Sequence, residues 1–161
     1  MHPDTRIMAP TARNTAKLPG APVKPLYPMP KGTVSIEDSI AMIPATQPIA
    51  IAMNDVTTVP SNITVGVTSY LVFKDPQSGE IRVFDRRVEA DLTLKFRLND
   101  KPGRHAWLVD DDTNTGWDSR GVALDGEWGK TKKRLKALEV QGDLPWGVIK
   151  HWWPGLKMVT R

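Results

Sequence analysis

Apolar and polar residues alternate along two stretches of the chain, and each stretch predicts a β-strand. Over 88–98 the even-numbered residues are apolar and the odd-numbered ones are polar or charged. A similar alternation covers 63–73, which is rich in the β-branched residues that favour strands. Shorter apolar segments predict further strands at 49–53, 80–84 and 104–109.

Two turns separate the predicted strands. Lys74–Gly79 contains a proline and ends on a glycine, and Asn99–Gly103 has the same character. Between the turns, the apolar positions change from odd to even numbers across Asp85–Arg87. A shift of one residue turns every side chain to the opposite face, so we expect a β-bulge or tight corner there. Residues 49–109 therefore predict an antiparallel meander with one apolar face and one solvated face.

The pattern is no longer strand-like in the last third of the chain. Asp110–Gly116 is an acidic loop. The glycine and glutamate that a calcium-binding EF-hand loop requires are missing from the corresponding positions, so we expect a solvated loop beside a basic helix. That helix is predicted over Glu127–Val140. A second, short helix is predicted with Asp143 as its N-cap, and it runs through Trp146–Trp153.

These elements predict a mainly β fold: an antiparallel β-sandwich or barrel body, an extended proline-rich N-terminal arm and a short C-terminal helical segment. We divide the 161 residues into the arm (1–32), a connector (33–48), the β body (49–109), and the acidic loop with a tryptophan-rich helical cap (110–161). The connector is expected to hold one helical turn near Ile36–Ala41.

The arm differs from the rest of the chain in composition. It holds seven of the fourteen prolines, and its five basic residues against one acidic residue account for the whole net charge of +4. Proline removes backbone donors and clashes with a helical turn, so the arm is expected to be extended or irregular. Its few apolar residues are spaced apart, and they predict separate contacts with partners instead of a core.

Composition also limits the chemistry that we expect. The chain has no cysteine, which excludes disulfides and thiolate metal sites, and its three histidines are scattered. No nucleophile elbow, zinc-protease motif or phosphate-binding loop is present, so we expect no enzyme activity, no cofactor and no metal site. No apolar run is long enough for a membrane span. Prolines and polar residues interrupt the start of the chain, which argues against a secretory signal peptide.

The predicted partner-binding residues are the apolar side chains of the arm and three tryptophans of the predicted cap. Aromatic residues contribute much of the binding energy of protein interfaces, and six tryptophans are many for this length. The set is Ile7, Met8, Leu18, Val23, Leu26, Tyr27, Met29, Trp146, Trp152 and Trp153.

The leading hypothesis is a non-enzymatic structural protein of a large repetitive assembly, most simply a virion. By architectural analogy alone, the roles that fit are capsid cement, decoration protein and minor capsid protein. The arm would clamp neighbouring subunits, capsid protein or further copies of this chain in a homo-oligomer. The expected location is a virion or an intracellular assembly; a subunit of a cellular complex is a lower-ranked hypothesis.

An alternative hypothesis is a single-stranded nucleic-acid-binding module. Basic residues that contact phosphates, with aromatic rings that stack on bases, are typical of such modules. The residues that suit this role, together with nearby tryptophans, are Lys130, Lys132, Lys133, Arg134 and Lys136. A solvated helix face paired with the acidic loop is the simpler interpretation of the same residues.

Overall fold

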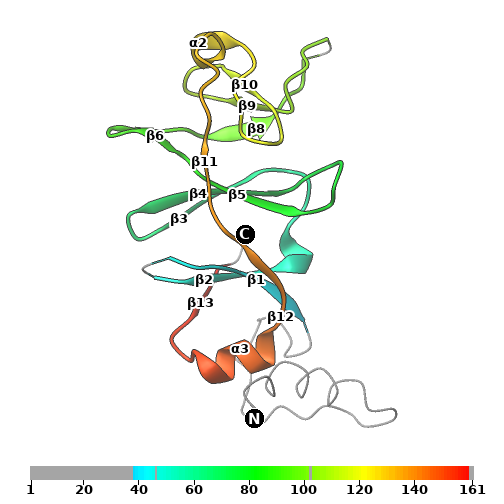
Figure 1. The fold of residues 1–161 in the computed structure, drawn as a ribbon, viewed down its shortest axis with the longest axis vertical. Helices are drawn as coiled ribbons and strands as arrows, with labels where there is room; N and C mark the ends of the chain where they lie inside the picture. Colours follow the sequence, from blue (N-terminus) through cyan, green and yellow to red (C-terminus); the bar gives the residue numbers. More distant parts are fainter. Residues whose placement is uncertain (1–37, 46, 102, 160–161) are drawn as a thin grey trace, which may run out of the picture.

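A computed structural model describes residues 38–45, 47–101 and 103–159, and the predicted arm lies outside these ranges. The described chain is mainly β and its sheets are largely antiparallel, which confirms the predicted fold class. The sheets and two short helices are stacked along the long axis of the molecule, with helix α2 at one end and helix α3 at the other (Figure 1).

The basal sheet lies next to α3 (Trp146–Trp152) and has the strand order β12-β1-β2-β13. It is a hairpin extended on both edges by strands from far along the chain, of which β12 is antiparallel to β1 and β13 is parallel to β2. Its strands are β1 (Ser39–Ile43), β2 (Ile49–Ala52), β12 (Gln141–Pro145) and β13 (Lys157–Val159).

The middle sheet has the order β11-β5-β4-β3 and is antiparallel throughout. Strand β4 carries four consecutive buried residues, Tyr70 to Phe73, as expected of a strand that is covered on both faces. The strands are β3 (Ser61–Val65), β4 (Thr68–Lys74), β5 (Ile81–Asp85) and β11 (Lys136–Ala137).

The upper sheet, of order β10-β9-β8, lies beyond the middle sheet with a two-stranded ribbon of β6 and β7 beside it (Figure 1). The short helix α2 (Gly126–Gly129) follows it in the chain, and a 3-10 turn, η2 (Met53–Asp55), follows β2. The strands are β6 (Arg87–Glu89), β7 (Leu92–Thr93), β8 (Phe96–Leu98), β9 (Leu108–Asp110) and β10 (Gly116–Trp117).

Three apolar cores hold these layers together. Between the basal and middle sheets, Ile49 and Ile51 pack with Val72 and Val83, as in a β-sandwich. On the other face of the middle sheet, Leu71 and Phe73 of β4 and Phe84 of β5 pack against the upper sheet. The upper sheet contributes Phe96 of β8 and Trp117 of β10 to this core. The third core joins α3 to the basal sheet through Ile40, Ala50, Trp146, Ile149 and Leu156. Each sheet therefore depends on its neighbour for burial of one face.

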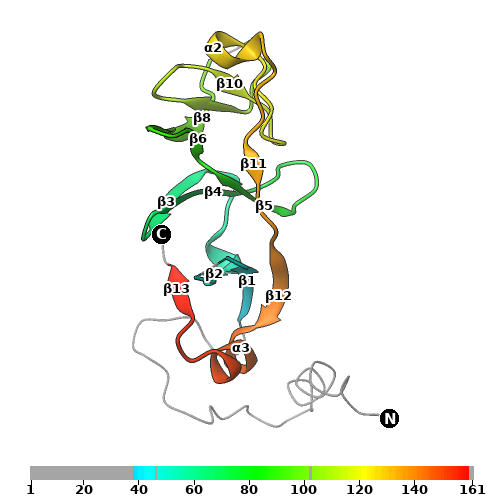
Figure 2. The same cartoon turned by 60° about the vertical axis from the view of Figure 1, so that its left-hand side comes forward.

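One segment runs along most of the length of the molecule (Figure 2). After α2 the chain descends past the middle sheet as β11, which pairs with β5, and reaches the basal sheet as β12. Between these strands the Leu138 amide donates to the Val83 carbonyl at 2.9 Å. The segment therefore ties the layers together by backbone hydrogen bonds.

Several predicted elements are wrong in detail. The single strand at 63–73 is the β3–β4 hairpin, because Gly66 adopts a φ of 60° and reverses the chain. The long strand at 88–98 is divided among β6, β7 and β8. The helical turn expected near Ile36–Ala41 is absent from its described part, since β1 begins at Ser39.

The predicted helix over Glu127–Val140 is also wrong. Only its first residues are helical, in α2. The chain is then extended, because the Leu135 amide donates to the Gly121 carbonyl and the Leu138 amide donates to the Val83 carbonyl of β5 instead of to a preceding helical turn. The second helix is confirmed over Trp146–Trp152, but Asp143 belongs to β12 and Pro145 takes the N-cap position.

A corner at Asp85–Arg87 was predicted, and the chain does leave the middle sheet there, between β5 and β6. The Arg86 side chain is turned inward and is only 8% exposed. Its guanidinium donates to the carbonyls of Tyr70 and Leu94 and to the hydroxyl of Thr64. Burial lowers the pKa of this arginine, and these bonds offset part of its desolvation.

Among the described residues, no helix is long and apolar enough to cross a membrane.

Candidate functional site

Helix α3 positions the tryptophans for which partner binding was predicted. Trp146 and Ile149 lie one turn apart and are buried against the basal sheet, which fixes the rotation of the helix. The helix ends where the Trp153 amide donates to the Ile149 carbonyl at 2.8 Å, just before Pro154. Trp152 is thus the last residue of the helix and Trp153 its C-cap, and both side chains are exposed.

The exposure of the three tryptophans separates their roles. Trp146 is 5% exposed and belongs to the core, so its side chain is not accessible to a partner. Trp152 and Trp153 are 56% and 51% exposed, and they are among the few large apolar side chains of the described chain that are exposed to this degree. Partner binding by these two residues remains a prediction.

Trp152 and Trp153 line a hollow of about 270 Å³, which we call the tryptophan groove. The buried residues Ile49 and Leu156 also line it, and so does Val65 at the end of β3. Its lining residues are Gln47, Pro48, Ile49, Val65, Trp152, Trp153, Pro154, Gly155, Leu156 and Lys157. The groove is therefore shared by three segments that are far apart in the sequence.

The groove is mainly apolar, and Lys157 is the charged residue of its lining. Two further residues of α3, Lys150 and His151, contact other side chains nearby. Lys150 lies over the Trp146 ring, with 5.6 Å between its ammonium nitrogen and the ring centroid, and it donates to the Pro154 carbonyl. The His151 ring meets the Trp152 ring edge-on at 6.0 Å. A surface of this kind binds apolar or aromatic groups and proline rings, whereas it lacks an acidic side chain that would attract a cation.

The arm residues for which partner binding was predicted lie outside the described residues. These are Ile7, Met8, Leu18, Val23, Leu26, Tyr27 and Met29.

The basic residues of the nucleic-acid alternative follow helix α2 and continue into β11. In Figure 1, α2 lies at the opposite end of the molecule from α3, whereas β11 lies beside the middle sheet. Arg134 and Lys136 are exposed on either side of the buried Leu135, so in the extended chain they share one face. Lys133 lies over the Trp128 ring at 5.2 Å, and Trp128 itself packs against the core. Lys130 and Lys132 are exposed in the turn after α2. The exposed tryptophans, Trp152 and Trp153, therefore do not form one surface with these basic residues.

The acidic loop is not the freely solvated loop that was expected. Asp110 is fully buried, and its carboxylate accepts hydrogen bonds from the Trp117 indole at 2.8 Å and from Thr113. Asp111 binds Arg97, and Asp112 accepts the Lys95 amide. These carboxylates fasten the loop to the upper sheet.

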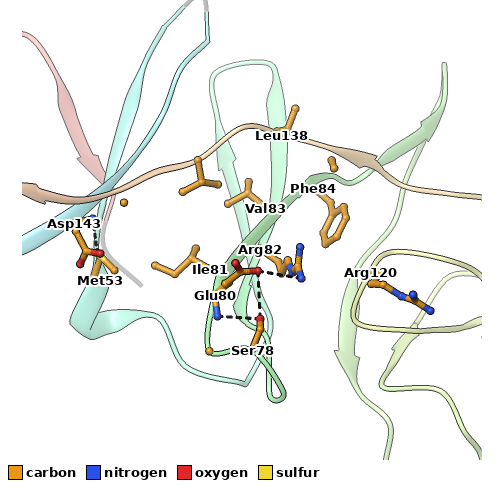
Figure 3. Close-up of a pocket in the computed structure, with 14 residues that line it drawn as sticks. Met53, Ser78, Glu80, Ile81, Arg82, Val83, Phe84, Arg120, Leu138 and Asp143 are labelled. Carbon is orange, nitrogen blue, oxygen red and sulfur yellow. Dashed lines mark hydrogen bonds and ion pairs between the residues drawn. The ribbon is translucent and has the colours of Figure 1, made fainter.

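A second hollow, of about 550 Å³, lies where the chain passes from the middle to the basal sheet (Figure 3). Ile81, Val83 and Leu138 give it an apolar wall. Arg82 faces it but already pairs with Glu80 at 3.2 Å and with Asp75 at 3.3 Å. In Figure 3, Ser78, Glu80 and Arg82 are joined to one another by hydrogen bonds and an ion pair.

Arg104 and Asp125 form the best-connected ion pair around the upper sheet. Asp125 accepts from Arg104 Nε at 2.8 Å and also accepts the Gly116 amide. The hydrogen bond from Arg104 is the main reason that the pKa of Asp125 lies below its usual value, although partial burial opposes it. The pair joins two loops and lines a shallow hollow next to His105.

Sequence reasoning found the two exposed tryptophans but missed the other walls of the groove. Val65 and Ile49 reach it only because β13 pairs with β2 in parallel and the β3–β4 hairpin folds over the same edge. No local pattern in the sequence signals either arrangement. Comparison with known proteins gives no match for this chain, whether with family models, with curated proteins or with solved structures.

Proposed function

We propose that this protein is a non-enzymatic structural subunit of a large repetitive assembly such as a virion, where it would act as a cement, decoration or minor capsid protein. The observation that supports this proposal is the tryptophan groove, a concave apolar surface with two half-exposed tryptophans. Buried tryptophans are frequent at the energetic centre of protein interfaces, and exposing them to water without a partner is unfavourable. In this proposal the arm and the groove both contact neighbouring subunits.

Co-sedimentation with the native particle tests this proposal. The full chain is compared with a chain whose residues 1–32 are replaced by a glycine-serine segment of equal length, which keeps the number of residues but removes the apolar side chains and the prolines. We expect the replacement to leave most of the protein in the slow-sedimenting fraction. Equal incorporation of both proteins would contradict a clamping role for the arm.

Binding to single-stranded nucleic acid is the alternative, and the exposed pair Arg134 and Lys136 is the observation that favours it. A titration with oligonucleotides at two salt concentrations tests it, since phosphate contacts make affinity fall steeply with salt. Salt-sensitive binding that is lost on R134E/K136E substitution would support the alternative. Absence of salt-sensitive binding would contradict the nucleic-acid alternative and leave the protein-binding proposal standing.

A further inference from the structure

The tryptophan groove lies close to the point where residues 1–37 join the described fold. Asp38 accepts a hydrogen bond from the Trp146 amide at 3.0 Å, and Ser39 pairs with Pro145 at the start of α3. The helix has seven residues and is therefore about 10 Å long. The chain that precedes Asp38 thus begins one short helix away from Trp152 and Trp153.

The sequence of this preceding chain has a spacing that suits an aromatic groove. Prolines occur at 19, 22, 25 and 28, a regular interval of three residues. A polyproline II helix has three residues per turn, so this spacing places all four prolines along one edge, about 9 Å apart. Polyproline II segments with this P-x-x-P spacing dock in grooves lined by aromatic side chains, because the segment loses little conformational entropy on binding.

The intervening chain is long enough for this segment to reach the groove of its own molecule. Residues 31–37 can span roughly 23 Å when extended, more than the length of α3. Because the segment and the groove belong to one chain, the effective concentration for their contact is in the millimolar range. A weak proline–tryptophan contact is therefore sufficient to keep the groove occupied.

From this geometry we infer that the tryptophan groove is the intramolecular docking site of residues 19–30. The proline edge packs against the rings of Trp152 and Trp153, and the apolar side chains of Leu26 and Tyr27 extend the contact. Both partners carry basic residues, Lys24 and Lys157, so the contact is apolar in origin and depends little on salt. This inference goes beyond the proposed function, since it concerns the free molecule; in an assembly, the segment would exchange its own groove for that of a neighbour.

The absence of cysteine permits a direct test on the full chain. A nitroxide label on A21C lies within the proline repeat, and the indole signals of the tryptophans report its proximity in NMR spectra. We expect the Trp152 and Trp153 signals to lose most of their intensity, while Trp117 and Trp128, which lie towards the other end of the molecule, keep theirs. Replacing all four prolines (P19A/P22A/P25A/P28A) should restore the lost intensity, whereas P3A/P10A, outside the repeat, should not.

Two results would overturn the inference. One is full retention of the Trp152 and Trp153 signals in the labelled protein. The other is a loss that appears equally when a labelled but NMR-silent copy is mixed with an unlabelled, isotope-enriched copy, because the docking would then be between molecules. Neither result depends on the native particle, so the proposed function and this inference fail separately.

Discussion

The side chain of Asn62 forms two hydrogen bonds with the backbone of Phe96, as a neighbouring strand would. Its amide nitrogen donates to the Phe96 carbonyl and its amide oxygen accepts the Phe96 N–H, each at 2.8 Å. Asn62 lies in β3, at the edge of the middle sheet, and Phe96 begins β8 of the upper sheet. One side chain thus connects two sheets that share no backbone ladder.

Replacing Asn62 with alanine should destabilise the fold. Both polar groups of Phe96 lose their partner, and Phe96 is buried, so we expect the free energy of unfolding to fall by about 1–3 kcal/mol. Urea unfolding followed by tryptophan fluorescence measures the change. Asn54→Ala, at an exposed position, is the control and should stay within about 0.5 kcal/mol of the parent. Equal midpoints for both variants would show that the bridge is dispensable.

Arg86 and Arg87 are adjacent, but Arg86 is buried and Arg87 is exposed. Substitution of each by lysine should therefore change the stability of the fold by different amounts. Arg86→Lys keeps the charge but cannot reproduce the three-way fork to Tyr70, Leu94 and Thr64, so we expect a loss of about 2 kcal/mol or more. Arg87 is exposed, and Arg87→Lys should have little effect. Thermal unfolding of the two variants measures the contrast, and a reversed order would refute the structural role given to Arg86.

Acid should weaken the molecule through Asp75 and Asp125. Burial raises the pKa of Asp75, but hydrogen bonds from the Gln77 and Ser78 amides and from Arg82 lower it by more, so the pKa lies below its usual value. The pKa of Asp125 also lies below its usual value, because of the hydrogen bond from Arg104. A carboxylate whose pKa is lower in the folded state stabilises the fold above its unfolded pKa and loses that effect as the pH falls.

We therefore expect the urea midpoint to be steady near neutral pH and to drop as the pH falls through about 4 and below. Asp125→Asn should be less stable at pH 7 and should show a shallower drop, because one of the two carboxylates no longer titrates. Parallel pH profiles for the parent and the variant would argue against a linked Arg104–Asp125 pair.

A methyl group at Gly116 should be poorly tolerated. A Cβ at this position would lie 2.6 Å from the Ala106 Cβ and 2.8 Å from an Asp125 oxygen, so the backbone or the ion pair must shift. We expect Gly116→Ala to cost about 1–3 kcal/mol. Gly155→Ala is a matched control, since nothing lies within 4 Å of its added methyl group. Differential scanning calorimetry of both variants tests the difference.

Alanine substitutions of Trp146 and Trp152 should have different effects, the first on stability and the second on partner binding. Trp146→Ala removes a core side chain and should cost about 3–5 kcal/mol of stability. Trp152→Ala should leave stability within about 0.5 kcal/mol, because the ring is more than half exposed. The same Trp152 variant should lower co-sedimentation with the native particle. A large loss of stability in Trp152→Ala would instead mean that its ring contributes to the core.

The elements that could be predicted from sequence are those with a local cause. Proline and glycine terminate α3 and shape the turn before β5, and β5 lies where a strand was expected. The hairpin at Gly66 also had a local signal, a glycine within an alternating run, which was interpreted as part of one long strand.

Other elements depend on partners far along the chain. Strand β12 has the sequence Gln-Gly-Asp-Leu-Pro, with no alternation, and is a strand because its backbone pairs with β1. The apolar spacing of Trp128, Leu135 and Leu138 suggested a helix, but Leu135 donates its amide to the Gly121 carbonyl and β11 pairs with β5. Tertiary hydrogen bonding thus overrides local propensity in this segment. Of the tryptophan groove, only the two exposed rings were foreseeable.

The late closure of the basal sheet has a consequence for the chain as it is translated. The β1–β2 hairpin, with the apolar segments Ile-Ala-Met-Ile and Ile-Ala-Ile-Ala, has both edges open until β12 and β13 have left the ribosome. At typical rates of synthesis this interval lasts roughly 5–20 s. Open apolar strand edges recruit other chains, so nascent copies on one messenger are at risk of pairing before they finish. The residues that complete the basal sheet are in this sense the protein's own protection against aggregation.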